Sequence, residues 1–394
     1  MKFAHSKEDN LGLDDKTLLQ NIGWRYLISE RFYYNLYLAR QKDSEGTEVN
    51  FPEVRFRDKY EIERFGIRND LGYEIDKNHS VEIGAFYTIE KGTYSFKIRD
   101  IKEGRDIEGK EEYNKNPFEV SFYLQNKLNL GRIHLFPGLR WDYFKLNERR
   151  NISPRFNLSY DLLKDLSLNL SAGAYYEPPE LTEFSKVNGE HLKDIPSKLV
   201  NQYVLGVDHK FRNVNIKLEG YYKDYKRLVL DKKGFAKGID LLFKYKDRDI
   251  LSFLSYSYLV SKRYNEDIKW YYHDYDETHT IPFVFNYKLK RWLDLNLKYH
   301  FGSGKPYTPY KGTPIEGKWN SERYPEYQRV DLKLSKDFRF SNSELTTYLE
   351  IVNLFNHKNV FMYYWDWDEE KGSCERKAVY QLPFLPILGA IFKF

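Results

Sequence analysis

Two histidines and two aspartates crowd one polar stretch of the chain, where they could bind a metal ion or an iron chelate. His273, Asp274, Asp276 and His279 lie close together in this stretch. Imidazole nitrogens and carboxylate oxygens are common metal ligands. In the alternative, which we favour, Asp276 and His279 belong to a structural motif at the end of a strand and the others are solvated. We therefore predict no metal site and no cofactor.

A second polar stretch combines aromatic and acidic side chains that could stack on and hydrogen-bond a sugar or a catecholate-like ligand. Trp365, Trp367 and Asp368 lie in this stretch, residues 362–378. The alternative, again favoured, is an aromatic girdle beneath an acidic rim. Together with Tyr310 of segment 303–326 and the four residues above, these side chains form the predicted set of ligand contacts.

The sequence offers little for covalent catalysis. None of the nine histidines lies near a convincing nucleophile, and the single cysteine, Cys374, has no partner for a disulfide or a CxxC motif. We predict that the chain is not an enzyme. A barrel enzyme with Ser, His and Asn or Asp on neighbouring strands is the alternative. The net charge of +5, with basic and acidic residues interleaved, indicates no nucleic-acid surface.

Long β-strands must position these side chains, because apolar residues recur at every second position. Such faces are formed by Leu168, Leu170, Ala172, Ala174 and Tyr176; by Val214, Ile216, Leu218, Gly220 and Tyr222; by Leu293, Leu295, Leu297, Tyr299 and Phe301; and by Val120, Phe122, Leu124 and Leu128. A soluble antiparallel sheet also alternates. Its strands average about five or six residues, however, whereas these run for about ten to sixteen, as membrane strands do.

About seventeen strands are predicted, and their connections alternate between tight turns and long polar loops. The strands cover residues 17–28, 31–41, 58–75, 79–98, 115–130, 132–147, 152–162, 166–177, 198–211, 213–229, 234–246, 250–261, 280–289, 292–302, 327–337, 344–361 and 382–394. The loops are 99–114, 178–197, 262–279, 303–326 and 362–381. This alternation is typical of the two rims of an outer-membrane barrel.

The C-terminal strand and the composition support the same fold class. Leu388, Ala390, Phe392 and Phe394 share one face, and the last residue is aromatic, as is usual for outer-membrane barrels. Aromatic residues make up 18% of the chain, which suits girdles at both membrane interfaces. We predict an all-β protein, a transmembrane antiparallel β-barrel.

Short motifs in the second half of the chain resemble, in order, those of the TonB-dependent outer-membrane receptors. They are Tyr203–Asp208, Leu218–Lys223, Ala236–Asp240, Ser255–Tyr258, Asp276–His279, Gly302–Thr308, Arg329–Leu332, Asn353–Asn356 and Phe394. Ala236–Asp240 departs from the family's KGxE pattern, since Asp replaces Glu. Each motif is weak alone, and their order carries the resemblance. The matches cover about residues 155–394.

The resemblance implies a 22-stranded barrel whose lumen is filled by an N-terminal plug domain, and energy transmitted through TonB. The first residues contain no apolar core of a signal peptide. We expect residues 1–394 to form a partial receptor barrel, the C-terminal part of that domain, with the plug, the signal peptide and the first strands missing. A complete smaller barrel is the alternative.

The predicted function is uptake of a scarce solute across the outer membrane of a Gram-negative cell. The resemblance implies a ferric siderophore or another metal chelate as the most common substrate class. Uptake of an oligosaccharide or cobalamin, and a plugless porin-like or adhesive barrel, are the alternatives. The expected partners are outer-membrane lipid, the TonB complex acting through a plug domain absent from this chain, and a small-molecule ligand, with the intact receptor a monomer.

Overall fold

The computed structural model describes residues 2–4, 10–50, 54–100, 104–112, 117–180, 195–229, 231–290, 293–309, 319–368 and 373–394. These residues form β-strands, turns and irregular segments, and none of them is helical. Within this described part, no helix long and apolar enough to cross a membrane is present. The all-β prediction is confirmed.

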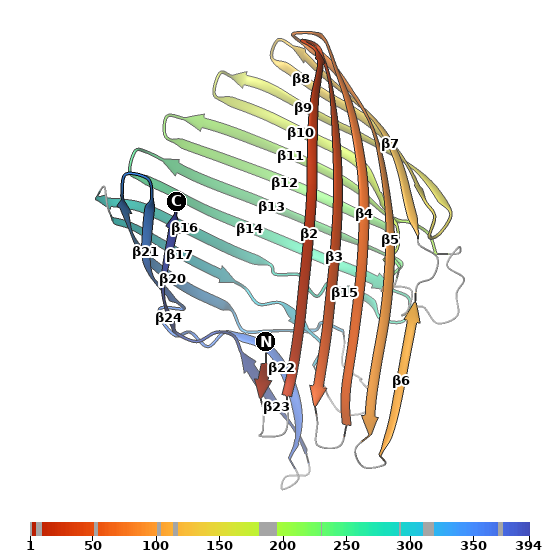
Figure 1. The fold of residues 1–394 in the computed structure, drawn as a ribbon, viewed down its shortest axis with the longest axis vertical. Helices are drawn as coiled ribbons and strands as arrows, with labels where there is room; N and C mark the ends of the chain where they lie inside the picture. The colour runs from red at the N-terminus through yellow and green to blue at the C-terminus, as the bar shows by residue number, and fades with distance from the viewer. Residues whose placement is uncertain are drawn as a thin grey trace. The chain divides into compact units, whose positions relative to one another are not determined.

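The chain divides into two compact units, which we describe one at a time (Figure 1). Unit 1 contains Met1–Asn157, Gly173–Leu199 and Arg227–Leu230, and unit 2 contains Leu158–Ala172, Val200–Lys226 and Asp231–Phe394. Four strands contribute residues to both units, namely β9 (Arg149–Leu163), β10 (Leu166–Glu177), β11 (Lys198–Phe211) and, with its last residue alone, β12 (Val214–Arg227).

Unit 1 is built on an antiparallel sheet of very long neighbouring strands. Its strands are β1 (Lys2–Ala4), β2 (Asn10–Ser29), β3 (Phe32–Asn50), β4 (Val54–Asp76), β5 (His79–Asp100), β6 (Arg105–Glu112), β7 (Phe118–Leu130) and β8 (Ile133–Phe144). Each strand from β2 to β5 pairs with the next in sequence, and β7 joins β5 to β8. The short β6 pairs with the C-terminal part of β5, and β1 pairs with the first residues of β2.

One face of this sheet carries an apolar belt. The belt comprises Phe65, Ile67, Leu71 and Tyr73 of β4, Val81, Ile83, Tyr87 and Ile89 of β5, and Phe118, Val120, Phe122 and Leu124 of β7, which the register places in rows. Phe122 also stacks on Trp141, with ring centroids 5.9 Å apart. On β4 the belt spans nine residues, from Phe65 to Tyr73. A tilted strand needs about nine to eleven residues to cross a bilayer.

The opposite, polar face of unit 1 is packed through tyrosines that lie over glycines. The Tyr123 hydroxyl lies 2.5 Å from an Asp70 oxygen and 2.8 Å from a Glu82 oxygen and shares its one proton between them, and Tyr33 donates to Glu82 at 2.9 Å. A Cβ added to Gly84 would lie 2.0 Å from the Tyr123 ring. A side chain at this position would displace the ring and its hydroxyl, and the buried carboxylate of Asp70 needs such a donor.

Unit 2 contains a ladder of antiparallel strands together with short hairpins. Its strands are β12 (Val214–Arg227, with Arg227 in unit 1), β13 (Lys233–Lys246), β14 (Ile250–Asn265), β15 (Lys269–Tyr272), β16 (His279–Lys290), β17 (Leu293–Gly302), β18 (Pro306–Tyr307), β19 (Glu322–Arg323), β20 (Tyr327–Arg339), β21 (Glu344–Val352), β22 (Val360–Asp368), β23 (Ser373–Tyr380) and β24 (Leu385–Lys393). The ladder runs β12, β13, β14, β16, β17, β20, β21, β24.

The register of unit 2 confirms the predicted alternation of apolar and polar faces. Leu297 of β17 lies between Phe285 of β16 and Leu332 of β20. The preceding residue, Asn296, lies in a row with Asn286 and Lys333 on the polar face. The C-terminal strand follows the same pattern, since Leu388 and Phe392 pair with Leu349 and Leu345.

All seventeen predicted strands are present, but three details differ. Strands β2, β3 and β4 extend toward their loop end beyond the predicted ranges by seven, nine and four residues, and cross-strand pairs such as Glu48 with Arg57 continue the ladder there. The strand predicted over 344–361 ends at Val352, since Asn353 and Asn356 adopt left-handed backbone with φ of 52°. The segments predicted as loops contain the short strands β6, β15, β18, β19, β22 and β23.

A charged residue on the apolar face should destabilise the protein far more than one on the polar face. We expect Leu297→Arg, in the middle of β17, to lower the free energy of unfolding by about 2–4 kcal/mol, because the guanidinium would lie near the bilayer centre. The matched variant Asn296→Arg should have little effect. Urea titration of the receptor in lipid vesicles measures both, and equal losses would refute the assignment of faces.

Candidate ligand-binding site

The segment between β15 and β16 is held by a buried carboxylate. Asp276 is fully buried and accepts a hydrogen bond from the Ser261 amide at 2.5 Å. Its carboxylate pairs with the Arg323 guanidinium, which also donates to the Asp276 carbonyl at 2.6 Å and to the Gly304 carbonyl at 3.1 Å. Arg323 lies on β19, so this pair fixes the hairpin of β18 and β19 against the segment.

The other three residues of that stretch have separate environments. Asp274 accepts a hydrogen bond from the Asn320 side chain at 2.6 Å. The ring of His279 lies 2.9 Å from the Tyr256 hydroxyl and packs against Tyr258. Burial, followed by the charge of Arg263, lowers the pKa of His273. Within the described residues, no three His, Cys, Asp or Glu side chains are grouped to hold a metal ion.

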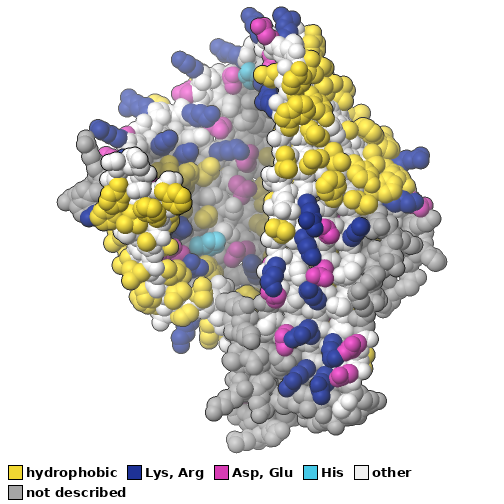
Figure 2. Space-filling view, viewed as in Figure 1, with side chains coloured by type: hydrophobic (Ala, Val, Ile, Leu, Met, Phe, Trp, Pro, Cys, Tyr) yellow, Lys and Arg dark blue, Asp and Glu magenta, His cyan; other side chains and the backbone are white. Residues whose placement is uncertain are grey.

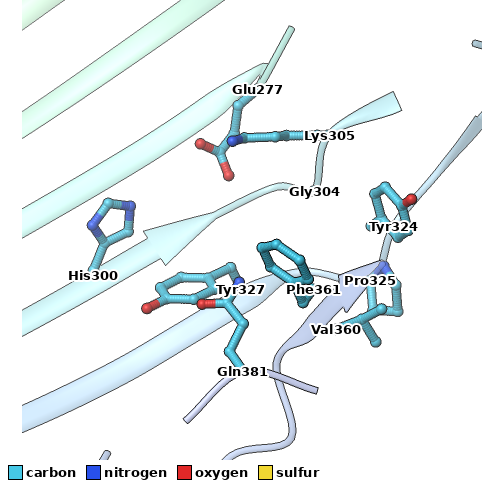
Figure 3. A pocket seen from close by; sticks show the side chains of 10 residues that line it. All are labelled: Glu277, His300, Gly304, Lys305, Tyr324, Pro325, Tyr327, Val360, Phe361 and Gln381. Atoms are coloured by element: carbon cyan, nitrogen blue, oxygen red, sulfur yellow. The ribbon is translucent and has the colours of Figure 1, made fainter. Parts of the chain in front are cut away.

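A cavity of about 310 Å³ lies on the loop side of unit 2 next to these contacts (Figure 3). It lies among residues that follow β17, residues that precede or begin β20, and the start of β22. Its lining residues are Glu277, His300, Gly304, Lys305, Tyr324, Pro325, Tyr327, Val360, Phe361 and Gln381. Cavities that combine aromatic side chains with a few charged groups are typical small-molecule sites.

Backbone geometry determines the shape of this cavity. Gly304 has a φ of +83°, and a Cβ there would lie 2.0 Å from the Tyr324 carbonyl oxygen. The fully buried side chain of Asn353 and the nearly buried Asn359 hold the segment after β21, and Asn359 exchanges two hydrogen bonds with the Gln328 backbone at 2.8 and 2.9 Å. Tyr327, at the start of β20, packs edge-on against His300 at 5.2 Å.

An aromatic cluster adjoins the cavity. The rings of Tyr307, Tyr324 and Tyr363 lie 4.7 to 5.1 Å apart, and Arg376 lies 4.4 Å above Tyr363. Arg376 also donates to the Tyr307 hydroxyl at 2.7 Å. Burial and the hydrogen bond to Glu322 raise the pKa of Tyr307 to about 12, so this hydroxyl stays protonated at neutral pH.

Three of the four remaining predicted contacts, Trp365, Trp367 and Asp368, belong to β22, which forms a hairpin with β23. Trp365 pairs with Arg376 across this hairpin. Trp367 and Asp368 belong to β22, but their side chains lie outside the described part, and Tyr310 lies outside it entirely. Sequence reasoning missed His300, Lys305, Tyr324 and Phe361 as cavity residues. The motif Gly302–Thr308, which contains Lys305, was the one signal for them.

Breaking the buried ion pair should release the segment it holds. We expect Arg323→Met to destabilise residues 273–278 by about 3–5 kcal/mol, because it leaves the Asp276 carboxylate buried and unpaired. Hydrogen exchange of these amides should accelerate while β16 and β17 stay protected. Lys232→Met, which removes an exposed pair with Glu266, is the control and should change nothing measurable. Unchanged exchange in Arg323→Met would contradict the structural role of the pair.

The fold resembles solved receptors at low sequence identity. The ferric citrate transporter FecA has a TM-score of 0.71 and 12% identity, and the match covers 98% of this chain and 62% of that one. The siderophore receptor PiuA of Acinetobacter baumannii gives 0.73 and 13%, with 99% and 67% covered. The ferric yersiniabactin uptake receptor FyuA of Yersinia pestis gives 0.74 and 14%, with 98% and 63% covered. This chain thus spans about two thirds of the length of these receptors.

No curated protein sequence matches this chain. The family model described as "TonB dependent receptor-like, beta-barrel" matches residues 3–354, most of the chain. This match agrees with the long alternating strands and with the ordered motifs. The chain therefore belongs to the TonB-dependent receptor β-barrel family.

Proposed function

We propose that this chain acts in the cell outer membrane as a receptor and transporter barrel for TonB-dependent uptake of a ferric siderophore or another metal chelate. The observation that carries the proposal is the cavity on the loop side of unit 2, with its aromatic and cationic lining. The similar receptors named above, whose names refer to ferric chelates or siderophores, support it.

The chemistry of the cavity suits an anionic chelate with flat ring or carboxylate groups. Lys305 can form charge-assisted hydrogen bonds to carboxylate or phenolate oxygens. Tyr324, Tyr327 and Phe361 supply ring surfaces for stacking. Glu277 lies near Lys305 (Figure 3) and would limit the number of negative charges that the cavity accepts.

We extend the proposed contact surface to the residues singled out from the sequence. The Asn320 side chain, just before β19, donates to the Tyr272 carbonyl and to Asp274, the two neighbours of His273 in the chain. Trp365 lies on the hairpin of β22 and β23. Tyr310, Trp367 and Asp368 belong to the same two segments. In this proposal Asp276 and His279 contribute by positioning backbone, not by touching the ligand.

The proposed partners follow from the family. Residues 1–394 would form one barrel region that works with a plug domain, which we place outside these residues, and with the TonB complex that acts on the plug. Outer-membrane lipid would surround the apolar face, and the intact receptor would be a monomer. Sequencing the genome upstream of the Met1 codon tests the arrangement, because it shows whether one reading frame also encodes a plug.

Uptake under iron limitation tests the function directly. We expect that deleting the gene for the complete receptor lowers accumulation of radioactive iron supplied as ferric citrate or as a ferric catecholate, and that deleting TonB has the same effect. Labelled maltodextrin and cobalamin serve as the comparison solutes. If the deletion strain took up iron normally but lost uptake of maltodextrin or cobalamin, the substrate would be that solute and not a metal chelate.

Reversing one charge in the cavity tests the site. In the purified receptor, Lys305→Glu should weaken binding of the cognate anionic chelate about tenfold or more, roughly 1.4 kcal/mol, since repulsion replaces attraction. The control is Lys246→Glu at the turn end of β13, which should leave affinity unchanged. Fluorescence titration measures both. Equal affinity of Lys305→Glu and the parent protein would remove the cavity from the binding site.

A further inference from the structure

Beyond the apolar belt, the same face of the unit 1 sheet becomes strongly basic. Strands β2 to β5 continue past Phe65 and Ile89 without any register shift, so alternate residues stay on that face. In Figure 2 hydrophobic side chains gather over one end of these strands and charged side chains follow beyond them. Within the described residues this face carries nine basic and six acidic side chains: Lys16, Arg40, Lys42, Arg55, Arg57, Lys59, Lys91, Lys97 and Arg99, and Asp14, Glu48, Glu61, Glu63, Asp106 and Glu108.

The row nearest the belt contains three cations around one carboxylate. Glu63 on β4 lies opposite Lys42 on β3 and opposite Lys91 on β5. Arg40, which lies opposite the belt residue Phe65, pairs with Glu63 at 2.6 Å. The two lysines lie two strands apart, about 10 Å between backbones, so their side chains can converge on one anion in front of Glu63.

Two cations of this row have no carboxylate partner among the described residues. Lys42 and Lys91 are exposed, and neither forms an ion pair with any described residue. Farther from the belt, carboxylates on the same face neutralise cations: Arg57 pairs with Glu48 at 2.8 Å, Lys59 with Glu61 at 2.9 Å, and Lys97 with Glu108. Since Arg40 already occupies Glu63, Lys42 and Lys91 leave two positive charges beside the belt.

The position of this row identifies its partner. The row lies two residues, about 7 Å, beyond the end of the belt along the strands. If the belt lies in hydrocarbon, the row therefore lies in the headgroup layer. The row faces away from the polar face, so a solute passing along that face does not meet it. We propose that Lys42 and Lys91, on either side of the Arg40–Glu63 ion pair, bind the phosphate of a lipid headgroup in the leaflet on the loop side of the membrane. Clusters of Lys and Arg at a membrane boundary attract anionic headgroups in this way.

Native mass spectrometry of the complete receptor tests the proposal. The receptor is extracted from vesicles that contain phosphatidylcholine alone or phosphatidylcholine with phosphatidic acid, and retained lipids are counted. The parent protein should retain phosphatidic acid selectively. Lys42→Gln with Lys91→Gln should lower its retention roughly 25-fold, since each lysine contributes about fivefold. Glu63→Gln should raise retention, because it removes the one carboxylate of the row.

Two further variants distinguish the site from net charge. Lys59→Gln with Lys97→Gln removes the same charge from the same face farther from the belt and should change retention little, and Lys42→Arg with Lys91→Arg should preserve it. Equal losses in both glutamine pairs, or no loss in either, would overturn the proposal. The proposal would also be overturned if the parent receptor were a dimer and only Lys42→Gln with Lys91→Gln made it a monomer. The proposal rests on the proposed membrane location and not on the solute, so its failure would leave the uptake result standing.

Discussion

The satisfaction of backbone hydrogen bonds within hydrocarbon is the constraint on which this structure depends. A backbone amide or carbonyl that faces lipid without a partner costs several kcal/mol, so each strand must be paired along its membrane segment. The registers show how this is met, since the rows of β4, β5 and β7 in unit 1 and of β16, β17 and β20 in unit 2 pair without interruption through their apolar segments. The alternation of side chains follows from this pairing, because a strand that is hydrogen-bonded on both edges can present only its two faces.

The two faces then have different packing requirements. Apolar side chains on one face need only lipid, whereas carboxylates and tyrosines on the other must find partners in the protein. Tyr123 meets this requirement by lying over Gly84 and sharing its hydroxyl proton between Asp70 and Glu82. At the loop end of unit 2, Arg323 meets it for Asp276 and so positions the hairpin and Gly304 beside the cavity.

This division separates the two proposed interactions of the molecule. The cavity draws on residues after β17 and at the start of β20, and its lining residue His300 shares the polar face of β17. The basic row of Arg40, Lys42 and Lys91 lies on the apolar face of unit 1, where the belt ends. A chelate would therefore be recognised by groups around the cavity, and lipid phosphate by groups on the apolar face. A substitution at one should leave the other intact.

The sequence by itself determined the fold class, because period-two alternation is a local property that each strand displays alone. The seventeen long strands, their apolar faces and the aromatic C-terminus could all be predicted in this way. Only the tertiary structure decided the extension of β2, β3 and β4, the hairpins within the long loops and the cavity. Asp276 and Arg323 lie 47 residues apart and Glu63 lies between Lys42 and Lys91 through cross-strand pairing. Such contacts join residues of different strands. They depend on which strands are neighbours and on their exact register, and the alternation within one strand reveals neither.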